Sequence, residues 1–303
     1  MLFSTESSPR SRKASAGAVV GVLDNIDTKE HDVTLTGYFV DLIAKFSSVP
    51  ECEVSARLES ELRDPGRLVA EAWRRADPGT PDEITRFYQE TDSYIYDLAS
   101  DHCCARRAIV WEAIVRRIER RGRCQDVLLY GDGIGTDSIS LARRGHRVSY
   151  FDLPGKTSAF AQFRFAKECV QDRIAVITRE TEIPPDSFDA VVCIEVLEHV
   201  PDPPGTLRNL FAALKRGGIA LITESFESVG AAYPSHLPSN LKYAGKTHRL
   251  MESLGFANTY FNTDPINRPM EFTKKDANLA GGLLWLIGRL RRAVQTKWRY
   301  LTQ

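Results

Sequence analysis

The stretch DVLLYGDGIG, residues 126–135, decides the fold. Its first half contains a short apolar run, Val127–Tyr130, and its second half places three glycines at alternate positions. Glycine lets the backbone turn sharply and lets a ligand approach it closely. Residues 137–144 then read as a helix, whose first turn would offer free amide N–H groups to an anionic ligand. The stretch therefore predicts a strand, a ligand-binding turn and a helix.

Alternating strand and helix signals continue along the chain after this turn. We expect strands at 147–151, 174–177, 188–194 and 219–223, and helices at 156–170 and 204–215. Short, continuous apolar strands separated by helices predict a parallel sheet that is covered by helices on both faces. The fold class is therefore α/β, Rossmann-like and doubly wound, with right-handed crossovers.

A carboxylate at the end of the second strand extends the pattern. Asp152 lies 21 residues after Gly131, where it can accept hydrogen bonds from both hydroxyls of a ribose. A glycine-rich turn alone is a weak signal, but the order of strand, glycine turn, helix, strand and acid indicates a nucleotide-type ligand. That ligand could still be the NAD of an oxidoreductase, and this alternative stays open on the pattern alone.

Four segments resemble the class I S-adenosylmethionine-dependent methyltransferases. Residues 131–135, GDGIG, are similar to the GxGxG loop of that family. Residues 188–203, FDAVVCIEVLEHVPDP, are similar to its fourth-strand motif, especially in the ubiquinone-biosynthesis O-methyltransferase type. LKRGG at 214–218 and LGF at 254–256 resemble the turns before its fifth and sixth strands. The resemblance covers about residues 123–273 and implies a mainly parallel seven-stranded sheet with S-adenosylmethionine as cofactor.

The resemblance also assigns residues to the cofactor. The predicted cofactor-binding residues are Gly131, Asp132, Gly133 and Gly135 near the methionine end, Asp152 at the ribose, and Cys193 and Glu195 beside the sulfonium. Residues 180–182 would lie near the adenine. One position departs from the family pattern, because Leu129 stands where an acid usually helps to hold the methionine amino group. Asp132 could compensate, but the departure leaves open a non-catalytic, methyltransferase-like module.

Two histidines fall where a methyl acceptor would lie. Methyl transfer requires alignment of acceptor, methyl carbon and sulfur, and a hydroxyl acceptor must also lose its proton, a task that suits histidine. His199 follows the fourth strand and His236 lies in the loop after the fifth, so both belong at the C-terminal edge of the sheet. We predict that both are catalytic. A structural role for either one, and methylation of nitrogen or carbon instead of oxygen, remain the alternatives.

The segment EVLEH, residues 195–199, contains a candidate metal site. Glu195, Glu198 and His199 resemble the divalent-metal motif of some ubiquinone O-methyltransferases and small-RNA 2′-O-methyltransferases, in which a further histidine completes the site. His236 could be that histidine. Carboxylates and imidazoles can hold a cation such as Mg²⁺ that polarises an acceptor hydroxyl. In metal-free relatives the glutamates cap and solvate the turn, which is the structural alternative.

Regions outside the core are expected to be accessory. Residues 1–66 would form an extension, disordered over 1–17, with a small β element suggested by alternation at 33–36 and 51–56. The segment 33–41 faintly resembles β modules of saccharide-modifying enzymes, which favours a sugar or a glycosylated metabolite as acceptor.

Two further accessory segments flank the core, which we expect at 123–275. Residues 67–122 predict a helical cap that closes the cofactor pocket. Tyr88, Tyr94 and Tyr96 in this cap are candidate contacts to cofactor or acceptor. Residues 276–303 predict a basic, amphipathic C-terminal helix that packs on the core or on a second subunit, so a homodimer is one possible assembly.

The bulk composition excludes several classes of protein. The chain has 40 basic and 40 acidic residues, so we expect no broad, non-specific attraction to nucleic acid. Its six cysteines are scattered without a CxxC pair, which is typical of reduced cytoplasmic thiols. No stretch reaches the roughly 18 apolar residues of a membrane span. The sequence thus predicts a cytoplasmic enzyme that acts on a small-molecule acceptor.

Overall fold

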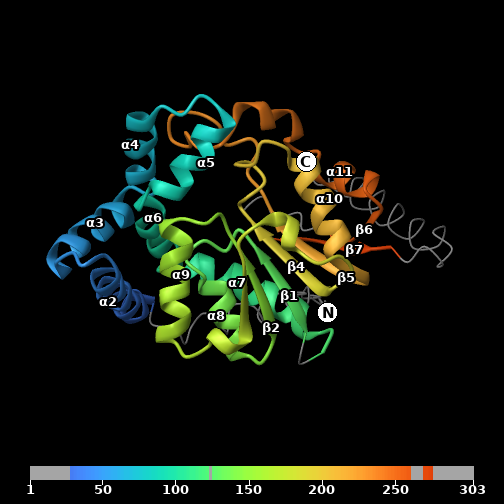
Figure 1. Cartoon of the computed structure of the whole chain (residues 1–303), viewed down its shortest axis with the longest axis horizontal. Helices are drawn as coiled ribbons and strands as arrows, with labels where there is room; N and C mark the ends of the chain where they lie inside the picture. The colour runs from blue at the N-terminus through green and yellow to red at the C-terminus, as the bar shows by residue number, and fades with distance from the viewer. Residues whose placement is uncertain (1–27, 123–124, 261–268, 276–303) are drawn as a thin grey trace, which may run out of the picture.

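The computed structural model describes residues 28–122, 125–260 and 269–275, in which a helical cap lies against an α/β core (Figure 1). The helices of the cap are α2 (Thr28–Ser47), α3 (Glu51–Arg63), α4 (Arg67–Ala76), α5 (Pro81–Glu90) and α6 (Ser93–His102). Helix α7 (Ala105–Glu119) then leads into the core.

The core is built on one seven-stranded sheet. Its strands are β1 (Asp126–Tyr130), β2 (Arg147–Phe151), β3 (Ile174–Ile177), β4 (Phe188–Ile194), β5 (Leu214–Thr223), β6 (Phe256–Tyr260) and β7 (Met270–Lys274). They lie in the order β3-β2-β1-β4-β5-β7-β6. The first five strands are mutually parallel, whereas β7 runs antiparallel to both of its neighbours. The predicted Rossmann-like fold is therefore confirmed, with one antiparallel strand in the sheet.

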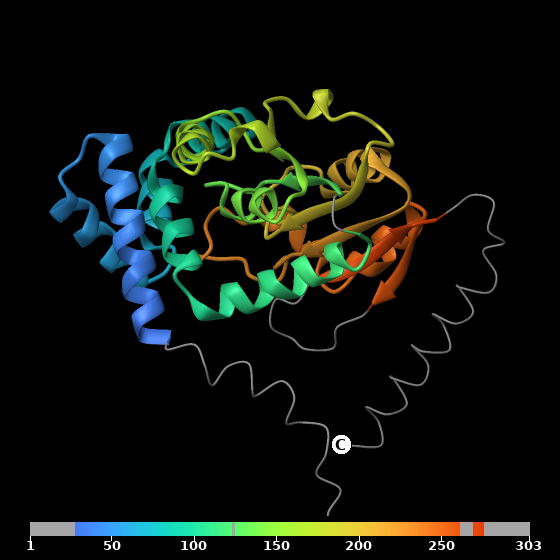
Figure 2. The same ribbon diagram turned by 90° about the horizontal axis from the view of Figure 1, so that it is seen from below.

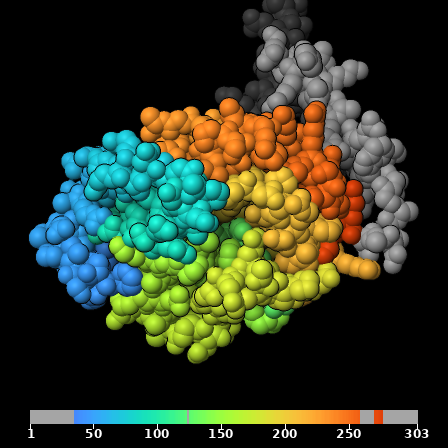
Figure 3. All heavy atoms as spheres, turned by 45° about the horizontal axis from the view of Figure 1, so that its top comes forward, coloured from blue at the N-terminus to red at the C-terminus, as the bar shows by residue number. Residues whose placement is uncertain are grey.

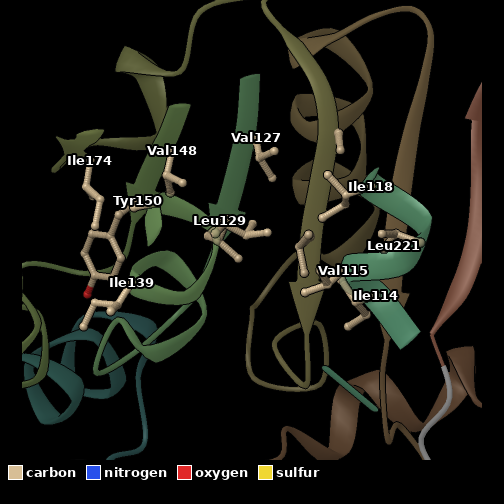
Figure 4. Close-up of a cluster of buried hydrophobic side chains, with 14 of the residues drawn as sticks. Ile114, Val115, Ile118, Val127, Leu129, Ile139, Val148, Tyr150, Ile174 and Leu221 are labelled. Atoms are coloured by element: carbon tan, nitrogen blue, oxygen red, sulfur yellow. The ribbon is translucent and has the colours of Figure 1, made fainter. Parts of the chain in front are cut away.

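Helices cover both faces of the sheet because its strands are apolar on both sides. Helices α7, α8 (Thr136–Arg143) and α9 (Lys156–Lys167) contribute to one buried cluster, and α10 (Pro203–Ala213) and α11 (Thr247–Ser253) to the other. Figure 2 shows α7 lying along one face of the sheet. Val127 and Leu129 of β1 belong to the first cluster together with Ile114 and Ile118 of α7 (Figure 4). Leu128, between them in β1, belongs to the second cluster.

The strand order reverses between β1 and β4, and this reversal positions the site. From β1 the chain proceeds outward to β2 and β3 and then returns to pair β4 with the other side of β1. The loops after these two strands must therefore diverge at the carboxyl edge of the sheet. Ligands of open α/β sheets bind in the crevice that such a reversal creates.

The predicted small β element is wrong, because α2 and α3 occupy that region. The short alternation at 33–36 lies within a helix whose core residues Phe39, Leu42 and Ile43 follow a helical spacing. In α3, the buried side chains of Val54, Leu58 and Glu61 likewise lie on one helical face. A window of four to six residues is too short to distinguish the two-residue period of a strand from the 3.6-residue period of a helix. Because the segment 33–41 is helical, its resemblance to the β modules of saccharide-modifying enzymes no longer supports a sugar as acceptor.

The cap is bound to the core through a third apolar cluster. Phe39, Leu58 and Ile95 of the cap pack with Ile134 and Phe160, which belong to the glycine turn and to α9. A second attachment lies at Gly155, where α9 begins: a Cβ atom there would lie 2.6 Å from the backbone of Gln89 at the end of α5. The cap therefore rests directly on the loops that form the site.

Two predictions concern residues outside the described ones: the disorder at 1–17 and the C-terminal helix at 276–303. Among the helices that the structure describes, none combines the length and the apolar composition required to cross a bilayer.

Candidate active site

A large cavity lies between the cap and the carboxyl edge of the sheet. Its volume of about 1310 Å³ exceeds the roughly 300–1,000 Å³ of an ordinary single-ligand pocket, so it can hold a nucleotide and a second molecule together. The core contributes Gly131, Asp152 and Glu195 to its wall, and the cap contributes Tyr88 and Asp101. In Figure 3 the cyan part of the cap meets the orange segment that follows β5.

The glycine turn lines the cavity through Gly131 and Gly133. Gly131 and Gly133 both have a left-handed backbone, with φ values of 76° and 53°. A Cβ at Gly133 would lie 2.3 Å from Cδ1 of Leu98, and one at Gly131 would lie 2.5 Å from Cγ2 of Val196. Helix α6, which carries Leu98, thus lies directly on the turn, and the left-handed backbone favours glycine at both positions.

Two of the predicted cofactor contacts lie behind the cavity wall. A Cβ at Gly135 would lie 2.4 Å from Cε1 of Phe165, so this glycine permits close packing of the glycine turn and α8 on α9. Cys193 is fully buried among apolar side chains of the sheet, and its burial raises the pKa of the thiol. Neither residue belongs to the cavity lining. Both assignments are therefore corrected: these residues pack the core.

The Asp132 side chain caps the N-terminus of α8. Its carboxylate accepts hydrogen bonds from the backbone N–H groups of Asp137 (3.3 Å) and Ser138 (2.8 Å) in the first turn of α8. Carboxylates at this position stabilise a helix because they pair with otherwise free N–H groups. Burial and the nearby Asp137 raise the pKa of Asp132. Asp132 therefore caps α8, and its raised pKa favours the uncharged carboxyl, which is a weak partner for an ammonium.

Asp152 lies where a ribose carboxylate is expected. Its Oδ2 accepts a hydrogen bond from the Gly133 N–H at 2.6 Å and its Oδ1 accepts one from the Leu153 N–H at 2.7 Å. Each carboxylate oxygen retains a second lone pair for a ligand hydroxyl. Burial raises the pKa of Asp152 to about 6. Beyond it, Glu180 lines the cavity and accepts a hydrogen bond from the Tyr130 hydroxyl at 2.9 Å, whereas Glu182 pairs with Arg179.

The two predicted catalytic histidines come together on the cavity wall after β4 and β5. The ring centroids of His199 and His236 lie 4.6 Å apart and the rings are nearly perpendicular. Nδ1 of His199 lies 3.1 Å from the Ser235 carbonyl oxygen and 3.0 Å from the Tyr88 hydroxyl. Burial lowers the pKa of His199 to about 3 and also lowers the pKa of His236. Both imidazoles are therefore neutral near pH 7.

The acidic residues beside the histidines are unusually constrained. Glu195 has a left-handed backbone, with φ of 50°, and its Oε1 is buried without a hydrogen-bond partner among the described residues. Glu198 is 1% exposed, and its Oε1 accepts a hydrogen bond from the Ser225 hydroxyl at 2.8 Å. Burial and the proximity of Glu195 raise the pKa of Glu198. Strain and buried carboxylates of this kind are typical of functional sites.

Three of these side chains form a compact group of possible metal ligands. In the described part of the chain, Glu198, His199 and His236 each offer one ligand atom, and these atoms lie within 4.8 Å of one another. Oε2 of Glu198 and Nδ1 of His236 are buried and have no hydrogen-bond partner there. These donors therefore fit a divalent cation. The set differs from the predicted Glu195, Glu198 and His199, because His236 takes the place of Glu195.

Helices α6 and α7 contribute charged groups that the sequence interpretation missed. Arg107 forms an ion pair with Asp137 of α8 and a second one, with Nε to Oδ2 of 3.4 Å, with Asp101. Nη1 of Arg107 is buried and has no hydrogen-bond partner among the described residues. Arg107 and Asp101 both line the cavity. No motif marks them, because α6 and α7 reach the site only through tertiary packing.

The tyrosines of the cap have different placements. Tyr88 and Tyr94 line the cavity and are stacked, with centroids 5.0 Å apart and an interplanar angle of 14°. Tyr96 is 1% exposed and its hydroxyl lies 3.1 Å from Nη1 of Arg57, so it packs within the cap. The predicted contact of Tyr96 with a ligand is therefore corrected, whereas Tyr88 and Tyr94 remain candidates.

Comparison with known proteins bears on the identity of this site. A family model described as a methyltransferase domain matches residues 101–267. A ubiquinone biosynthesis O-methyltransferase of Pseudomonas fluorescens is 39% identical over 94 residues, which is 30% of this chain and 40% of that protein. The matched segment thus spans less than half of the curated relative.

Solved structures with a similar fold include two methyltransferases. Phosphoethanolamine N-methyltransferase 2 of Haemonchus contortus is 24% identical with a TM-score of 0.40, over 49% of this chain and 39% of that chain. An S-adenosylmethionine-dependent methyltransferase of Mesorhizobium loti is 17% identical with a TM-score of 0.39, over 54% of this chain and 94% of that chain.

Proposed function

Because the chain belongs to the methyltransferase-domain family, among the class I S-adenosylmethionine-dependent enzymes, we propose that it transfers a methyl group to a hydroxyl of a small molecule. The observation that carries this proposal is the meeting of His199, His236 and Glu198 on the cavity wall. The glycine turn and Asp152 line the same cavity. Family membership favours methyl transfer over the alternative of an NAD-dependent oxidoreductase.

The cofactor compartment follows from these placements. Asp152 would bind the ribose hydroxyls through its two oxygens, and Gly131 and Gly133 would let the methionine end approach the backbone. Arg107 would bind the carboxylate of the methionine moiety through Nη1, because a buried guanidinium nitrogen without a partner is stabilised by an anionic ligand. The sulfonium is already activated, so alignment with the acceptor supplies much of the catalysis.

The acceptor compartment would be the part of the cavity bounded by His199, His236 and Tyr88. A proton acceptor works best when its pKa lies near the operating pH, and a His199 pKa of about 3 makes this imidazole a weak general base. A neutral imidazole is, however, a suitable hydrogen-bond acceptor and metal ligand. If Nδ1–H of His199 donates to the Ser235 carbonyl, its Nε2 keeps a free lone pair.

We therefore assign Glu198, His199 and His236 as the residues that would hold a divalent cation. When bound, such a cation would lower the pKa of an acceptor hydroxyl, which removes the need for a strong base. A donor set of two imidazoles and one carboxylate suits Mn²⁺, Co²⁺ or Zn²⁺ better than the all-oxygen preference of Mg²⁺. The name O-methyltransferase, carried by the curated relatives, agrees with a hydroxyl acceptor.

Release of S-adenosylhomocysteine tests the proposed function. The full chain is incubated with S-adenosylmethionine and matched pairs of phenols and anilines, sugars and amino sugars, with and without Mn²⁺. We expect turnover with hydroxyl members, and a loss of orders of magnitude in His199→Ala and His236→Ala. His248→Ala is the matched control, because His248 lies on α11 outside the cavity lining.

Three outcomes would overturn parts of the proposal. Absence of S-adenosylmethionine binding at millimolar concentration in calorimetry would contradict the cofactor assignment. Preferential turnover of the amine members would replace oxygen by nitrogen as the methylated atom. Unchanged turnover in both histidine variants would remove their catalytic assignment.

A further inference from the structure

The acid that usually holds the cofactor's ammonium is missing from β1. Leu129 occupies that position, is 2% exposed and belongs to the apolar cluster between the sheet and α7. The ammonium of S-adenosylmethionine would still have to leave water to enter the cavity, and a charge transferred without a counter-charge is costly. A carboxylate from elsewhere in the fold, near the glycine turn, would supply that counter-charge.

Helix α6 brings a carboxylate to that place. Leu98 of α6 lies against Gly133 so closely that a Cβ on the glycine would be 2.3 Å from its Cδ1. Asp101 follows Leu98 by three residues and therefore lies on the same helical face. The Arg107 guanidinium joins Asp101 to Asp137 in the first turn of α8, which fixes Asp101 beside the end of the turn.

The Asp101 carboxylate is available to a ligand. It lines the cavity, and its side chain remains 56% exposed despite the pairing with Arg107. The neighbouring acids do not have this combination: Asp132 caps α8, and Asp137 is 4% exposed and paired with Arg107. Asp97, one turn earlier on α6, also lines the cavity, and burial raises its pKa to about 7. Burial raises the pKa of Asp101 as well, but the adjacent Arg107 opposes that shift, whereas Glu61 and Asp101 raise the pKa of Asp97 further.

The pair of Asp101 and Arg107 also matches the ligand chemically. The amino-acid end of the cofactor carries an ammonium and a carboxylate on one carbon atom. An anionic and a cationic side chain side by side on the cavity wall complement that zwitterion. The buried Nη1 of Arg107, which has no partner among the described residues, is the independent sign that this part of the wall is built for a ligand.

We propose that Asp101, supplied by the helical cap, binds the ammonium of the cofactor's methionine moiety in place of the acid absent from β1. This inference rests on the proposed function. It implies that cofactor binding requires the cap and not only the Rossmann-like core. It also removes the reason for regarding the chain as a module unable to bind the cofactor, since the missing charge is replaced from another element.

Calorimetry with three ligands tests the assignment. The ligands are S-adenosylhomocysteine, its deaminated analogue, which lacks only the ammonium, and 5′-methylthioadenosine, which lacks the whole amino-acid end. The wild-type chain is expected to bind S-adenosylhomocysteine about 10- to 100-fold more tightly than the deaminated analogue, the range of a charge-assisted hydrogen bond. Asp101→Asn should abolish this preference and leave the affinity for methylthioadenosine unchanged.

The matched variant Asp97→Asn separates Asp101 from its neighbour. It changes an acid on the same helix and the same cavity wall, and we expect it to keep the preference for the ammonium-bearing ligand. Loss of the preference in Asp97→Asn but not in Asp101→Asn would overturn the assignment, as would a wild-type chain that does not distinguish the two ligands. Binding of none of the three ligands by the wild type would instead contradict the proposed function itself.

Discussion

The Tyr88 hydroxyl lies 3.0 Å from Nδ1 of His199, although 111 residues separate them in the chain. Tyr88 belongs to α5 of the cap, and His199 follows β4 of the core. The two parts of the molecule therefore share a hydrogen bond at the site of the proposed chemistry.

Tyr88→Phe should separate this bond from simple packing. The ring stays in place while the hydroxyl is lost, so the free energy of unfolding should fall by about 1 kcal/mol, the usual net contribution of one hydrogen bond. The KM for the acceptor should rise more than that for S-adenosylmethionine, because the lost contact lies in the proposed acceptor compartment. Tyr94→Phe is the matched comparison, since it removes a hydroxyl from the ring stacked on Tyr88 and keeps both groups of the Tyr88–His199 bond. Equal kinetic effects in the two variants would refute the special position of Tyr88.

Metal affinity should depend on Glu198 more than on Glu195. Glu198 belongs to the compact group with the two histidines, whereas Glu195 does not. Titration calorimetry with Mn²⁺ should show affinity reduced at least about tenfold in Glu198→Gln and much less in Glu195→Gln.

The same titration has an expected pH dependence. Because the pKa of Glu198 is raised, binding of a cation should release a proton, and affinity should increase with pH. Absence of binding at millimolar Mn²⁺, or equal losses of affinity in the two variants, would contradict the assignment of a cation site to Glu198 and the two histidines.

Nucleoside affinity should weaken in acid. The ligand-free pKa of Asp152 is raised to about 6 by burial, and the ionised carboxylate is the form that accepts hydrogen bonds from ribose hydroxyls. Affinity for 5′-methylthioadenosine should therefore be constant above about pH 7 and fall as pH decreases through 6. Asp152→Asn should bind more weakly and lose this pH dependence. A wild-type profile that stays flat between pH 5 and 8 would exclude Asp152 as the titrating group.

The same raised pKa has a consequence for the stability of the ligand-free chain. A carboxyl group whose pKa is higher in the folded state than in the unfolded state contributes stability below the unfolded value and loses it as pH rises through the folded value. Asp97, with a pKa of about 7, acts in the same direction. Asp97→Asn should therefore gain melting temperature relative to wild type between pH 6 and 8. A constant difference across this range would contradict the burial of that charge.

Gly135→Ala should destabilise the fold by about 1–3 kcal/mol, the usual cost of overpacking. The added methyl group would overlap Phe165, and φ at this position is 76°. Gly145→Ala provides the control, because φ there is 93° and a Cβ would meet nothing within 4 Å. Chemical denaturation should show a smaller loss in Gly145→Ala. Equal losses would mean that the backbone conformation alone, and not contact with Phe165, requires glycine at 135.

The sequence predicted the core well because its signals are local. The strands at 147–151, 174–177 and 188–194 coincide with β2, β3 and β4, and each is a short apolar run between helices. Gly131, Gly133 and Asp152 could be placed at the cavity because their roles depend on the turn that contains them. The two motifs did not distinguish Gly135 and Cys193, each of which lies close in sequence to cavity-lining residues but behind the wall.

The remainder of the site depends on tertiary packing. Arg107 and Asp101 reach the cavity because α6 lies on Gly133 through Leu98, and this contact has no counterpart in the local sequence. The prediction of a β element in the N-terminal region failed for a different reason. Alternation over four residues at 33–36 is compatible with either period, and the helical face of Phe39, Leu42 and Ile43 is visible only over a longer window.

The contact between Gly155 and Gln89 offers a way to redesign what the protein accepts. The backbone at Gly155 is extended, with φ of 172°, so another residue could adopt it without strain. The Gln89 backbone, 2.6 Å from the position of a Cβ, is the nearest obstacle to a side chain there. A library of substitutions at position 155 would therefore place side chains of increasing size against Gln89 and displace α5 outward by increasing amounts. Bulkier substrates could then be admitted while every chemically active group keeps its identity.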